Sequence, residues 1–250
     1  MTASAAATLL EAKALNAWYG AAHILFDVDL HVNRGEVVAL MGRNGAGKST
    51  TLKALMGLLA APQGRRSGRV HFMGHDISDA APHEIARSGL GFVPEDRRIF
   101  SDLTVLENLE VGRQAPRRWP DGSAAPVWQA GQLFRLFPNL GEMQQRPGGR
   151  MSGGEQQMLT VARTLMGNPF VVLLDEPSEG VAPLIVEQMA HMIQALKGQG
   201  VSILLSEQNL HFAALVADRV YVLEKGQIRY SATMQALAAD EEVRRAYLSL

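Results

Sequence analysis

The chain has 250 residues, enough for one large domain or two small ones. Its 47% of hydrophobic and 20% of charged residues are typical of a globular protein, and its formal net charge of -1 gives no excess of positive charge that would indicate nucleic-acid binding. The absence of cysteine excludes disulfides and cysteine-ligated metal. No apolar run approaches the roughly 20 residues that cross a bilayer, so a role at a membrane would require membrane-embedded partners.

The first part of the chain predicts a small antiparallel sheet followed by a buried strand. Residues 1–9 are rich in alanine but lack the basic start of a signal peptide, and we predict a short disordered tail there. Residues 10–32 and 69–72 have the pattern of short antiparallel strands. Residues 36–41 (EVVALM) predict a strand that runs into a glycine-rich turn.

The glycine-rich turn matches the pattern G-x-x-x-x-G-K-[ST] over residues 42–49. Glycines let the backbone approach phosphate oxygens without a Cβ clash, and the amides of the loop and of the predicted helix at 50–59 point at the anion. Lys48 is expected to reach the β- and γ-phosphates and the Ser49 hydroxyl to bind Mg²⁺. A chance turn before a helix is the alternative. The predicted nucleotide-binding residues are Gly42, Asn44, Gly45, Ala46, Gly47, Lys48, Ser49 and Thr50.

The middle of the chain, residues 93–165, predicts a mostly helical subdomain because strand signals fade there. Within it, residues 114–126 (QAPRRWPDGSAAP) are rich in Pro, Gly, Ser and Ala and predict an exposed, mobile loop. Residues 151–157 (MSGGEQQ) predict a helix start, with Ser152 as the N-cap and two glycines that expose the first amides. An ordinary capping box of the Ser-x-x-Glu type is the alternative reading of this segment.

The last third returns to alternating helices and buried strands. Spacing of the type i, i+3, i+4, i+7 predicts helices around 158–165 and 185–196. Residues 170–174 and 201–205 predict strands buried on both faces, as in a parallel sheet. We therefore predict an α/β fold, in which the core with its antiparallel subdomain comprises residues 10–92 and 166–250.

Two acids follow the strand at 170–174, at the edge of a parallel sheet where ligands bind. Asp175 is placed to hold Mg²⁺, directly or through water, and Glu176 to polarise an attacking water as general base. A solvated Asp-Glu turn before Pro177 is the alternative. The phosphate loop upstream favours the catalytic interpretation.

The order of phosphate loop, MSGGEQQ segment and acidic strand end resembles the ATP-binding cassette family over nearly the whole chain. The family signature L-S-G-G-[QE]-[QR] implies that Ser152, Gly153 and Gly154 bind the γ-phosphate of ATP held by an opposite subunit. Tyr19 matches the aromatic residue that stacks on adenine, with simple packing as the alternative. The resemblance implies a P-loop NTPase core with a parallel sheet, an antiparallel β subdomain and a helical subdomain.

Three positions depart from the family pattern. Residues 178–181 (SEGV) lack the usual Asp of S-A-L-D, which puts its contact across the dimer in doubt. Glu95 occupies the lid position that normally carries Gln, and it can still bind Mg²⁺ or orient water. Gln208 occupies the switch position that normally carries His, and it cannot carry a proton. A regulatory subunit that binds ATP but barely hydrolyses it is therefore an alternative.

The same departures resemble one subfamily, the ATP-binding subunits of branched-chain amino-acid importers of the LivF type. The similar segments are 93–100, 103–105, 107–109, 176–180, 207–209 and 240–247. The implied function is ATP hydrolysis that powers uptake of branched-chain, hydrophobic amino acids, with urea or short amides as alternative solutes. The long loop before Val127 fits this subfamily poorly.

The resemblance implies roles and partners that composition alone cannot give. The implied catalytic residues are Glu176, Lys48, Gln208 and Glu95, and the implied Mg²⁺ ligands are Ser49, Asp175 and Glu95. ATP and Mg²⁺ are the implied cofactors, and two subunits are expected to meet head to tail across two ATP molecules.

The implied partners are permease subunits, a homologous ATP-binding subunit or a second copy of this chain, and indirectly a solute-binding protein. We expect no nucleic-acid partner, and a peripheral location on the cytoplasmic face of the inner membrane. Ile99, Phe100 and Leu103 lie in the segment that forms the permease groove in the family, with core packing as the alternative. A cassette ATPase acting on DNA or ribosomes is the rival class, and the chain lacks the long coiled coil or second cassette usual there.

Overall fold

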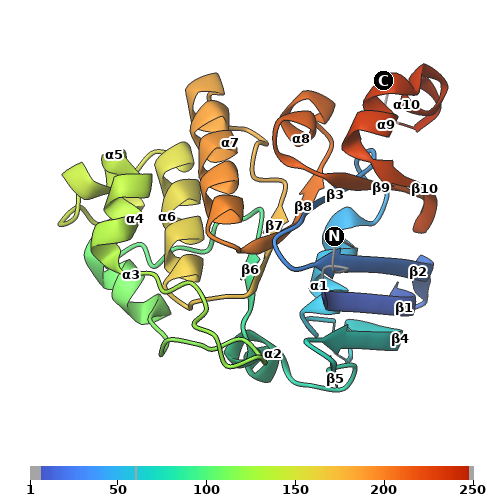
Figure 1. Ribbon diagram of the computed structural model, residues 1–250, viewed down its shortest axis with the longest axis horizontal. Helices are drawn as coiled ribbons and strands as arrows, with labels where there is room; N and C mark the ends of the chain where they lie inside the picture. The colour runs from blue at the N-terminus through green and yellow to red at the C-terminus, as the bar shows by residue number, and fades with distance from the viewer. Residues whose placement is uncertain (1–6, 60, 248–250) are drawn as a thin grey trace.

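A six-stranded sheet forms the central layer of the computed structural model, which describes residues 7–59 and 61–247 (Figure 1). Its strand order is β10-β9-β3-β8-β7-β6, and all neighbours are parallel except the edge pair β9–β10. The strands are β3 (Val37–Met41), β6 (Leu90–Val93), β7 (Val171–Asp175), β8 (Ser202–Glu207), β9 (Arg219–Glu224) and β10 (Gln227–Thr233). Every residue of β3, β7 and β8 is buried, because the layers on both faces cover these apolar runs.

A second, antiparallel sheet packs beside the first in the order β2-β1-β4-β5. Its strands are β1 (Thr8–Tyr19), β2 (Ala22–Asn33), β4 (Gly64–Phe72) and β5 (His75–Asp76). Since β1 begins at Thr8 and Leu9 is buried, the predicted disordered tail is wrong for residues 8 and 9. Residues 1–6 of that predicted tail lie outside the described residues.

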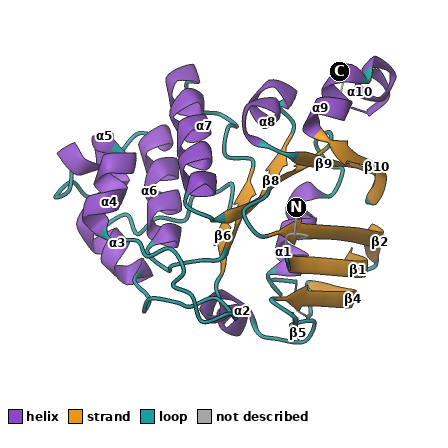
Figure 2. Cartoon of the chain, in the orientation of Figure 1, coloured by secondary structure: helices purple, strands orange, loops and turns teal. Residues whose placement is uncertain are grey.

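The helices divide between the sheet core and one end of the molecule, where Figure 2 shows α3 to α6 gathered beside the sheets. Around the core lie α1 (Lys48–Leu55), α2 (Pro82–Ser88), α7 (Pro183–Gly198), α8 (Leu210–Val216), α9 (Met234–Ala239) and α10 (Glu241–Tyr247). The helical lobe contains α3 (Val105–Gly112), α4 (Ala130–Leu136), α5 (Pro138–Glu142), a 3-10 turn (Gly148–Arg150) and α6 (Gly153–Leu165).

One apolar cluster joins the helical lobe to the core. Leu109 of α3 and Leu159 of α6 belong to the same buried cluster as Val172 of β7 and Ile193 of α7. A separate cluster joins the antiparallel sheet to α1 and the opposite face of the central sheet. The central sheet therefore fixes both the helical lobe and the antiparallel sheet, because each face contributes side chains to a different core.

The proline-rich loop (residues 114–126) is exposed over most of its length, as predicted, but Trp119 and Ala125 are buried against the core. Trp119 is only 4% exposed, and its ring centroid lies 4.7 Å from that of Phe170. The guanidinium carbon of Arg34 lies over the same indole ring, 3.8 Å from its centroid. Arg117 donates hydrogen bonds to the backbone carbonyls of Arg87 and Asn168. Proline and glycine correctly predicted irregular backbone, and the buried tryptophan attaches this exposed loop to the core.

Among the described residues, no helix has the length and apolar character needed to span a bilayer.

Replacing Trp119 with Ala should destabilise the protein by roughly 3 kcal/mol, because a large buried aromatic side chain is lost. Urea unfolding followed by circular dichroism would measure the free energy of unfolding. Arg118→Ala is the matched control, since Arg118 is exposed and should change stability by less than about 0.5 kcal/mol. Equal stability of Trp119→Ala and the wild type would show that the loop does not contribute to the fold.

Candidate functional site

The candidate site lies where strands β3, β7 and β8 end, at the carboxyl edge of the parallel sheet. The loop of residues 42–47 connects β3 to α1 there. Gly47 has a φ of 109°, which a residue with a Cβ rarely adopts. A Cβ at Gly42 would lie 2.4 Å from the carbonyl oxygen of Leu223, so this position is also closed to larger residues. The tight turn brings the first amides of α1 to the sheet edge, where they can bind an anion.

Lys48 is the first residue of α1 and is buried within this loop. Its Nζ donates hydrogen bonds to the carbonyl oxygens of Gly42, at 2.8 Å, and of Arg43, at 3.2 Å. The same Nζ lies 3.0 Å from Oε1 of Glu176, whose side chain is also buried. A buried ammonium requires such partners, so the contacts hold Lys48 at the position where a phosphate group would meet the loop.

Asp175 and Ser49 lie together at the end of β7. The Ser206 hydroxyl donates a 2.7 Å hydrogen bond to Oδ1 of Asp175, and the Ser49 side chain also hydrogen-bonds this carboxylate. Burial raises the pKa of Asp175, although both hydroxyls act against that shift. Carboxylate and hydroxyl oxygens are the donors that Mg²⁺ prefers.

The described residues contain no group of three or more His, Cys, Asp or Glu side chains arranged to hold a metal. Asp175 and Ser49 nevertheless fit a Mg²⁺ ion, because this ion usually takes one or two protein oxygens and completes its shell with water and phosphate. Glu95 lines the same cavity as Asp175, so the third predicted ligand is also at this edge.

Glu176 has an unusual backbone conformation, with φ of 45°. Its N–H donates to both the carbonyl and the hydroxyl oxygen of Ser206 on β8, each at 3.1 Å, which fixes the residue at the strand end. Burial acts to raise the pKa of Glu176, but hydrogen bonds with Glu179 and Lys48 outweigh it, and the pKa lies below its usual value. Glu176 is therefore held as a carboxylate, the form in which it can accept a proton.

Glu179 is a member of the site that the sequence analysis did not assign. Its carboxyl group hydrogen-bonds that of Glu176, and this contact, with burial and the charges of Glu176 and Glu95, raises the pKa of Glu179 to about 7. The two carboxyl groups share a proton because both cannot be charged at such close range. The signal in the sequence was an acid three residues after the proposed general base, inside the atypical segment 178–181.

Glu207 is a second residue that the sequence analysis missed. It ends β8, is buried, and its carboxylate accepts N–H groups of Ser178, Gln208 and Asn209 at 3.0–3.2 Å. Burial raises the pKa of Glu207, with these hydrogen bonds acting in the opposite direction. Glu207 thus ties the segment after the acidic pair to the predicted switch, where the Gln208 side chain is exposed.

Tyr19 ends β1 and lies at the mouth of the site with 39% of its surface exposed. It lines one cavity with Gly45, Lys48 and Thr50, and a neighbouring cavity with Glu95. An exposed aromatic ring beside the phosphate loop provides a surface on which a planar base can stack.

The MSGGEQQ segment belongs to the other lobe and does not line the cavities at the phosphate loop. The Ser152 hydroxyl accepts the N–H of Glu155, whose carboxylate accepts the N–H of Ser152, so a capping box begins α6. The amides of Gly153 and Gly154 form the first turn of this helix. A single chain therefore presents two separate glycine-containing helix starts, those of α1 in the core and α6 in the helical lobe (Figure 1).

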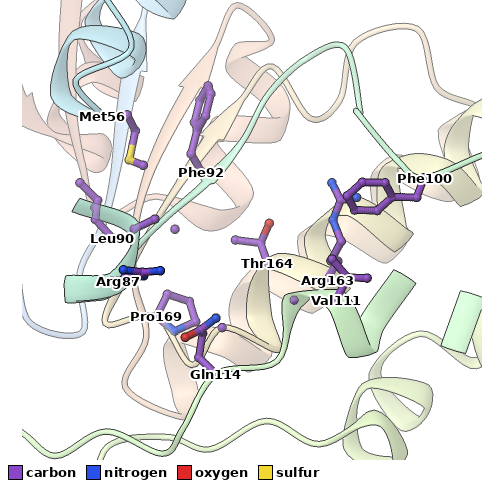
Figure 3. Close-up of a pocket in the computed structure, with 14 residues that line it drawn as sticks. Met56, Arg87, Leu90, Phe92, Phe100, Val111, Gln114, Arg163, Thr164 and Pro169 are labelled. Atoms are coloured by element: carbon purple, nitrogen blue, oxygen red, sulfur yellow. The ribbon is translucent and has the colours of Figure 1, made fainter. Parts of the chain in front are cut away.

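A third feature is a groove of ≈ 400 Å³ between the core and the helical lobe, shown in Figure 3. Met56, Leu90 and Phe92 line the core side, and Phe100 and Val111 line the side of the helical lobe. Phe100 is 47% exposed. Ile99, by contrast, is partly buried and packs on the apolar cluster that joins the helical lobe to the core. Phe100 therefore lies at the groove, whereas the neighbouring Ile99 contributes to core packing.

Three comparisons with known proteins agree with this geometry. The family model described as ABC transporter matches residues 25–179. The chain is 42% identical to the high-affinity branched-chain amino acid transport ATP-binding protein BraG of Pseudomonas aeruginosa, covering 96% of this chain and 99% of BraG. It is 34% identical to the lipopolysaccharide export system ATP-binding protein LptB of Haemophilus influenzae, over 96% and 97% of the two chains.

A solved ATP-binding cassette of an ABC transporter, in its ADP conformation, has the same fold. It superposes with a TM-score of 0.76 and 28% identity, and covers 95% of this chain and 97% of the other.

The shared proton of Glu176 and Glu179 predicts how stability depends on pH. The folded protein binds a proton at Glu179 more tightly than the unfolded chain does, so the free energy of unfolding should fall as pH rises from roughly 5 to 7. Glu179→Gln should remove this loss, which thermal melts of the wild type and variant across that range would measure. Glu187→Gln, at an exposed position on α7, is the control. Parallel curves for Glu179→Gln and the wild type would contradict the shared proton.

Proposed function

Because the chain belongs to the ABC transporter family and is one of its ATPases, we propose that it powers an importer of branched-chain amino acids. The observation that carries the choice of solute is the similarity to BraG over almost the whole of both chains. Identity to the lipopolysaccharide export subunit is lower over the same span.

The proposed reaction is hydrolysis of ATP at the carboxyl edge of the sheet. Lys48 and the amides of the phosphate loop would bind the β- and γ-phosphates, with Tyr19 against adenine. The phosphates compete with Glu176 for the ammonium of Lys48, so binding frees the carboxylate to face a water molecule. The water oxygen attacks the γ-phosphorus while the bond between that phosphorus and the β,γ-bridging oxygen breaks. Glu176 accepts the proton that the attacking water loses.

The metal-binding oxygens would be those of Ser49 and Asp175, with Glu95 at the lid side of the cavity. A bound Mg²⁺ would neutralise charge on the phosphate oxygens. Gln208 can donate a hydrogen bond to a γ-phosphate oxygen from its exposed position after β8.

The two glycine-containing helix starts support a dimer that completes its sites across subunits. Ser152, Gly153 and Gly154 of one subunit would bind the γ-phosphate held by the phosphate loop of the other. ATP then favours the closed dimer because it contacts both subunits only in that state. The proposed partner is a homologous ATP-binding subunit or a second copy of this chain.

The groove between the lobes is the proposed contact with the permease, on the cytoplasmic face of the inner membrane. It is largely apolar and carries the exposed Phe100, as expected of a surface that another protein covers. A solute-binding protein would act on the complex indirectly, through the permease.

The experiment that tests the solute is reconstitution of the chain with its permease and solute-binding protein in proteoliposomes. Leucine, isoleucine or valine should stimulate ATP turnover and be taken up, whereas urea and acetamide should do neither. Stimulation by urea or acetamide alone would assign the chain to the alternative class of importer. Turnover that no solute changes would contradict an importer.

Glu176→Gln should lower the kcat for ATP by at least about a hundredfold, because the base that accepts the proton is lost. ATP binding should persist, since the amide retains the shape of the side chain. Phosphate release and nucleotide affinity measure the two effects separately. Unchanged turnover would show that Glu176 is not the base and would favour a regulatory subunit.

Phe100→Asp should abolish co-purification with the permease, because it places a charge in an apolar contact. Leu215→Asp is a matched control, since Leu215 is also 47% exposed but lies on α8. ATP binding by both isolated variants should equal that of the wild type. Loss of the permease from both variants, or from neither, would exclude the groove as the specific contact.

A further inference from the structure

Glu207 is a buried acid to which the proposed reaction assigns no role. It ends β8 and is only 1% exposed. None of the ion pairs among the described residues includes it. A buried carboxylate without a cationic partner destabilises the fold, because it loses its hydration and gains no opposite charge in return. Hydrogen bonds alone offset this loss, so their donors indicate what the residue does.

The carboxylate of Glu207 accepts hydrogen bonds from two separate turns. Its Oε1 accepts the N–H of Ser178 at 3.2 Å, and the Ser178 hydroxyl also hydrogen-bonds this carboxylate. Its Oε2 accepts the N–H of Gln208 at 3.1 Å and that of Asn209 at 3.0 Å. One turn follows β7 and the other follows β8. A single side chain therefore joins the two turns, and it does so as an acceptor on both oxygens.

The turn after β7 carries the proposed general base in a conformation that needs support. Glu176 has a φ of 45°, which residues with a Cβ rarely adopt. Such a conformation persists only where the surrounding contacts fix it. Ser206 accepts the N–H of Glu176 at one end of the turn. Glu207 accepts the N–H of Ser178 at the other end, so two neighbouring residues of β8 hold the turn.

The turn after β8 carries the predicted switch residue. The carboxylate accepts two consecutive N–H groups, those of Gln208 and Asn209, and this fixes the backbone where β8 ends. The Asn209 side chain accepts the N–H of Phe212 and caps α8. Because the backbone is held from both directions, the exposed side chain of Gln208 projects from a fixed point of the sheet edge.

The link to the general base continues through Glu179. Glu179 directly follows Ser178, and its carboxyl group hydrogen-bonds that of Glu176. A shift of the Ser178 backbone would therefore move the hydrogen-bond partner of the base together with the turn. Misplacement of reacting groups by about 1 Å can lower a rate by roughly a hundredfold. Loss of one hydrogen bond to Glu207 is thus sufficient to slow the chemical step.

We propose that Glu207 is a positioning residue for ATP hydrolysis. Its carboxylate keeps the turn of the general base and the turn of the switch in one relative position, so the attacking water and the γ-phosphate contact are placed together. Glu207 does not line the cavities at the phosphate loop, and it acts through Glu176 and Gln208. The inference rests on the roles that the proposed function gives to these two residues.

Glu207→Gln removes one acceptor and keeps the size of the side chain. The amide oxygen can serve only one of the two turns, because the NH₂ group meets an N–H donor at the other. We expect the kcat for ATP to fall by about tenfold or more. The KM and the Kd for ATP should stay within about twofold of the wild type, because the loss concerns the transition state and not ground-state binding.

Ser202→Ala is the matched control for the stability of β8. Ser202 is also buried, and it accepts the N–H of Gly35 at the opposite end of the same strand. Its replacement should lower the melting temperature and leave kcat unchanged. A loss of kcat in Ser202→Ala equal to that in Glu207→Gln would attribute the effect to the strand and would overturn the positioning role.

Ser178→Ala tests the same link from the turn after β7, without a change in the buried strand. It removes the hydroxyl hydrogen bond to Glu207 and retains the N–H. The kcat should fall by a smaller factor, about threefold, again with unchanged ATP affinity. This half-buried loop position keeps the test decisive if Glu207→Gln does not fold.

Combination of Glu207→Gln with Gln208→Ala tests whether Glu207 acts through the switch. The double variant should lose less activity than the product of the two single losses, because both changes disturb the same contact. Losses that multiply would overturn the proposed link.

Hydrogen exchange measured by NMR follows the geometry without ATP turnover. The amide protons of Ser178, Gln208 and Asn209 should exchange slowly in the wild type, because a buried carboxylate accepts them. In Glu207→Gln, exchange should become about tenfold faster or more in at least one of the two turns. Unchanged exchange in both turns would contradict the proposed role of the carboxylate.

Wild-type kcat in Glu207→Gln and Ser178→Ala would overturn the proposal, as would a loss confined to KM and ATP affinity. Glu176→Gln, measured in parallel, separates this result from failure of the proposed function. If Glu176→Gln retains turnover, the general base is misassigned and the positioning role fails with it. If Glu176→Gln is inactive while Glu207→Gln is fully active, the positioning role alone fails.

Discussion

The buried contact between Lys48 and Glu176 is the interaction on which the arrangement of the site depends. Two charged groups removed from water destabilise the fold unless they form an ion pair and further hydrogen bonds. The central sheet meets this requirement by ending three neighbouring strands, β3, β7 and β8, at one edge. Ser206 of β8 bonds to both members of the acidic pair, so the same contacts that satisfy buried charge also position the catalytic groups.

The two lobes depend on this edge in different ways. The core supplies the phosphate loop and the acids, whereas the helical lobe supplies a second helix start that the same chain does not bring to its own nucleotide cavity. Trp119 of the proline-rich loop packs on Phe170, the residue just before β7, and so connects the loop to the strand that carries the acids. A change in the position of one lobe can therefore reach the chemistry through a small number of identifiable contacts.

Much of the fold follows from local sequence, because buried parallel strands and amphipathic helices have distinct periods. The strands at 37–41 and 171–175 and the phosphate loop were predictable in this way. The helix after the loop ends at Leu55, earlier than the predicted 59, where Gly57 adopts a φ of 69°. The role of Glu207 was not predictable, since its partners come from two loops that only the folded sheet brings together. The environment of Trp119 likewise depends on a strand about 50 residues away.

Disulfide trapping across the proposed dimer tests the central claim most directly, and the natural chain provides a background free of cysteine. Asn44→Cys in the phosphate loop and Ser152→Cys in the signature would be combined with Glu176→Gln, which should retain ATP. The account predicts a disulfide between two chains that forms with ATP and Mg²⁺ and not without them. ATP-independent trapping, or no bond between chains in the presence of ATP, would contradict a site completed by the opposite subunit.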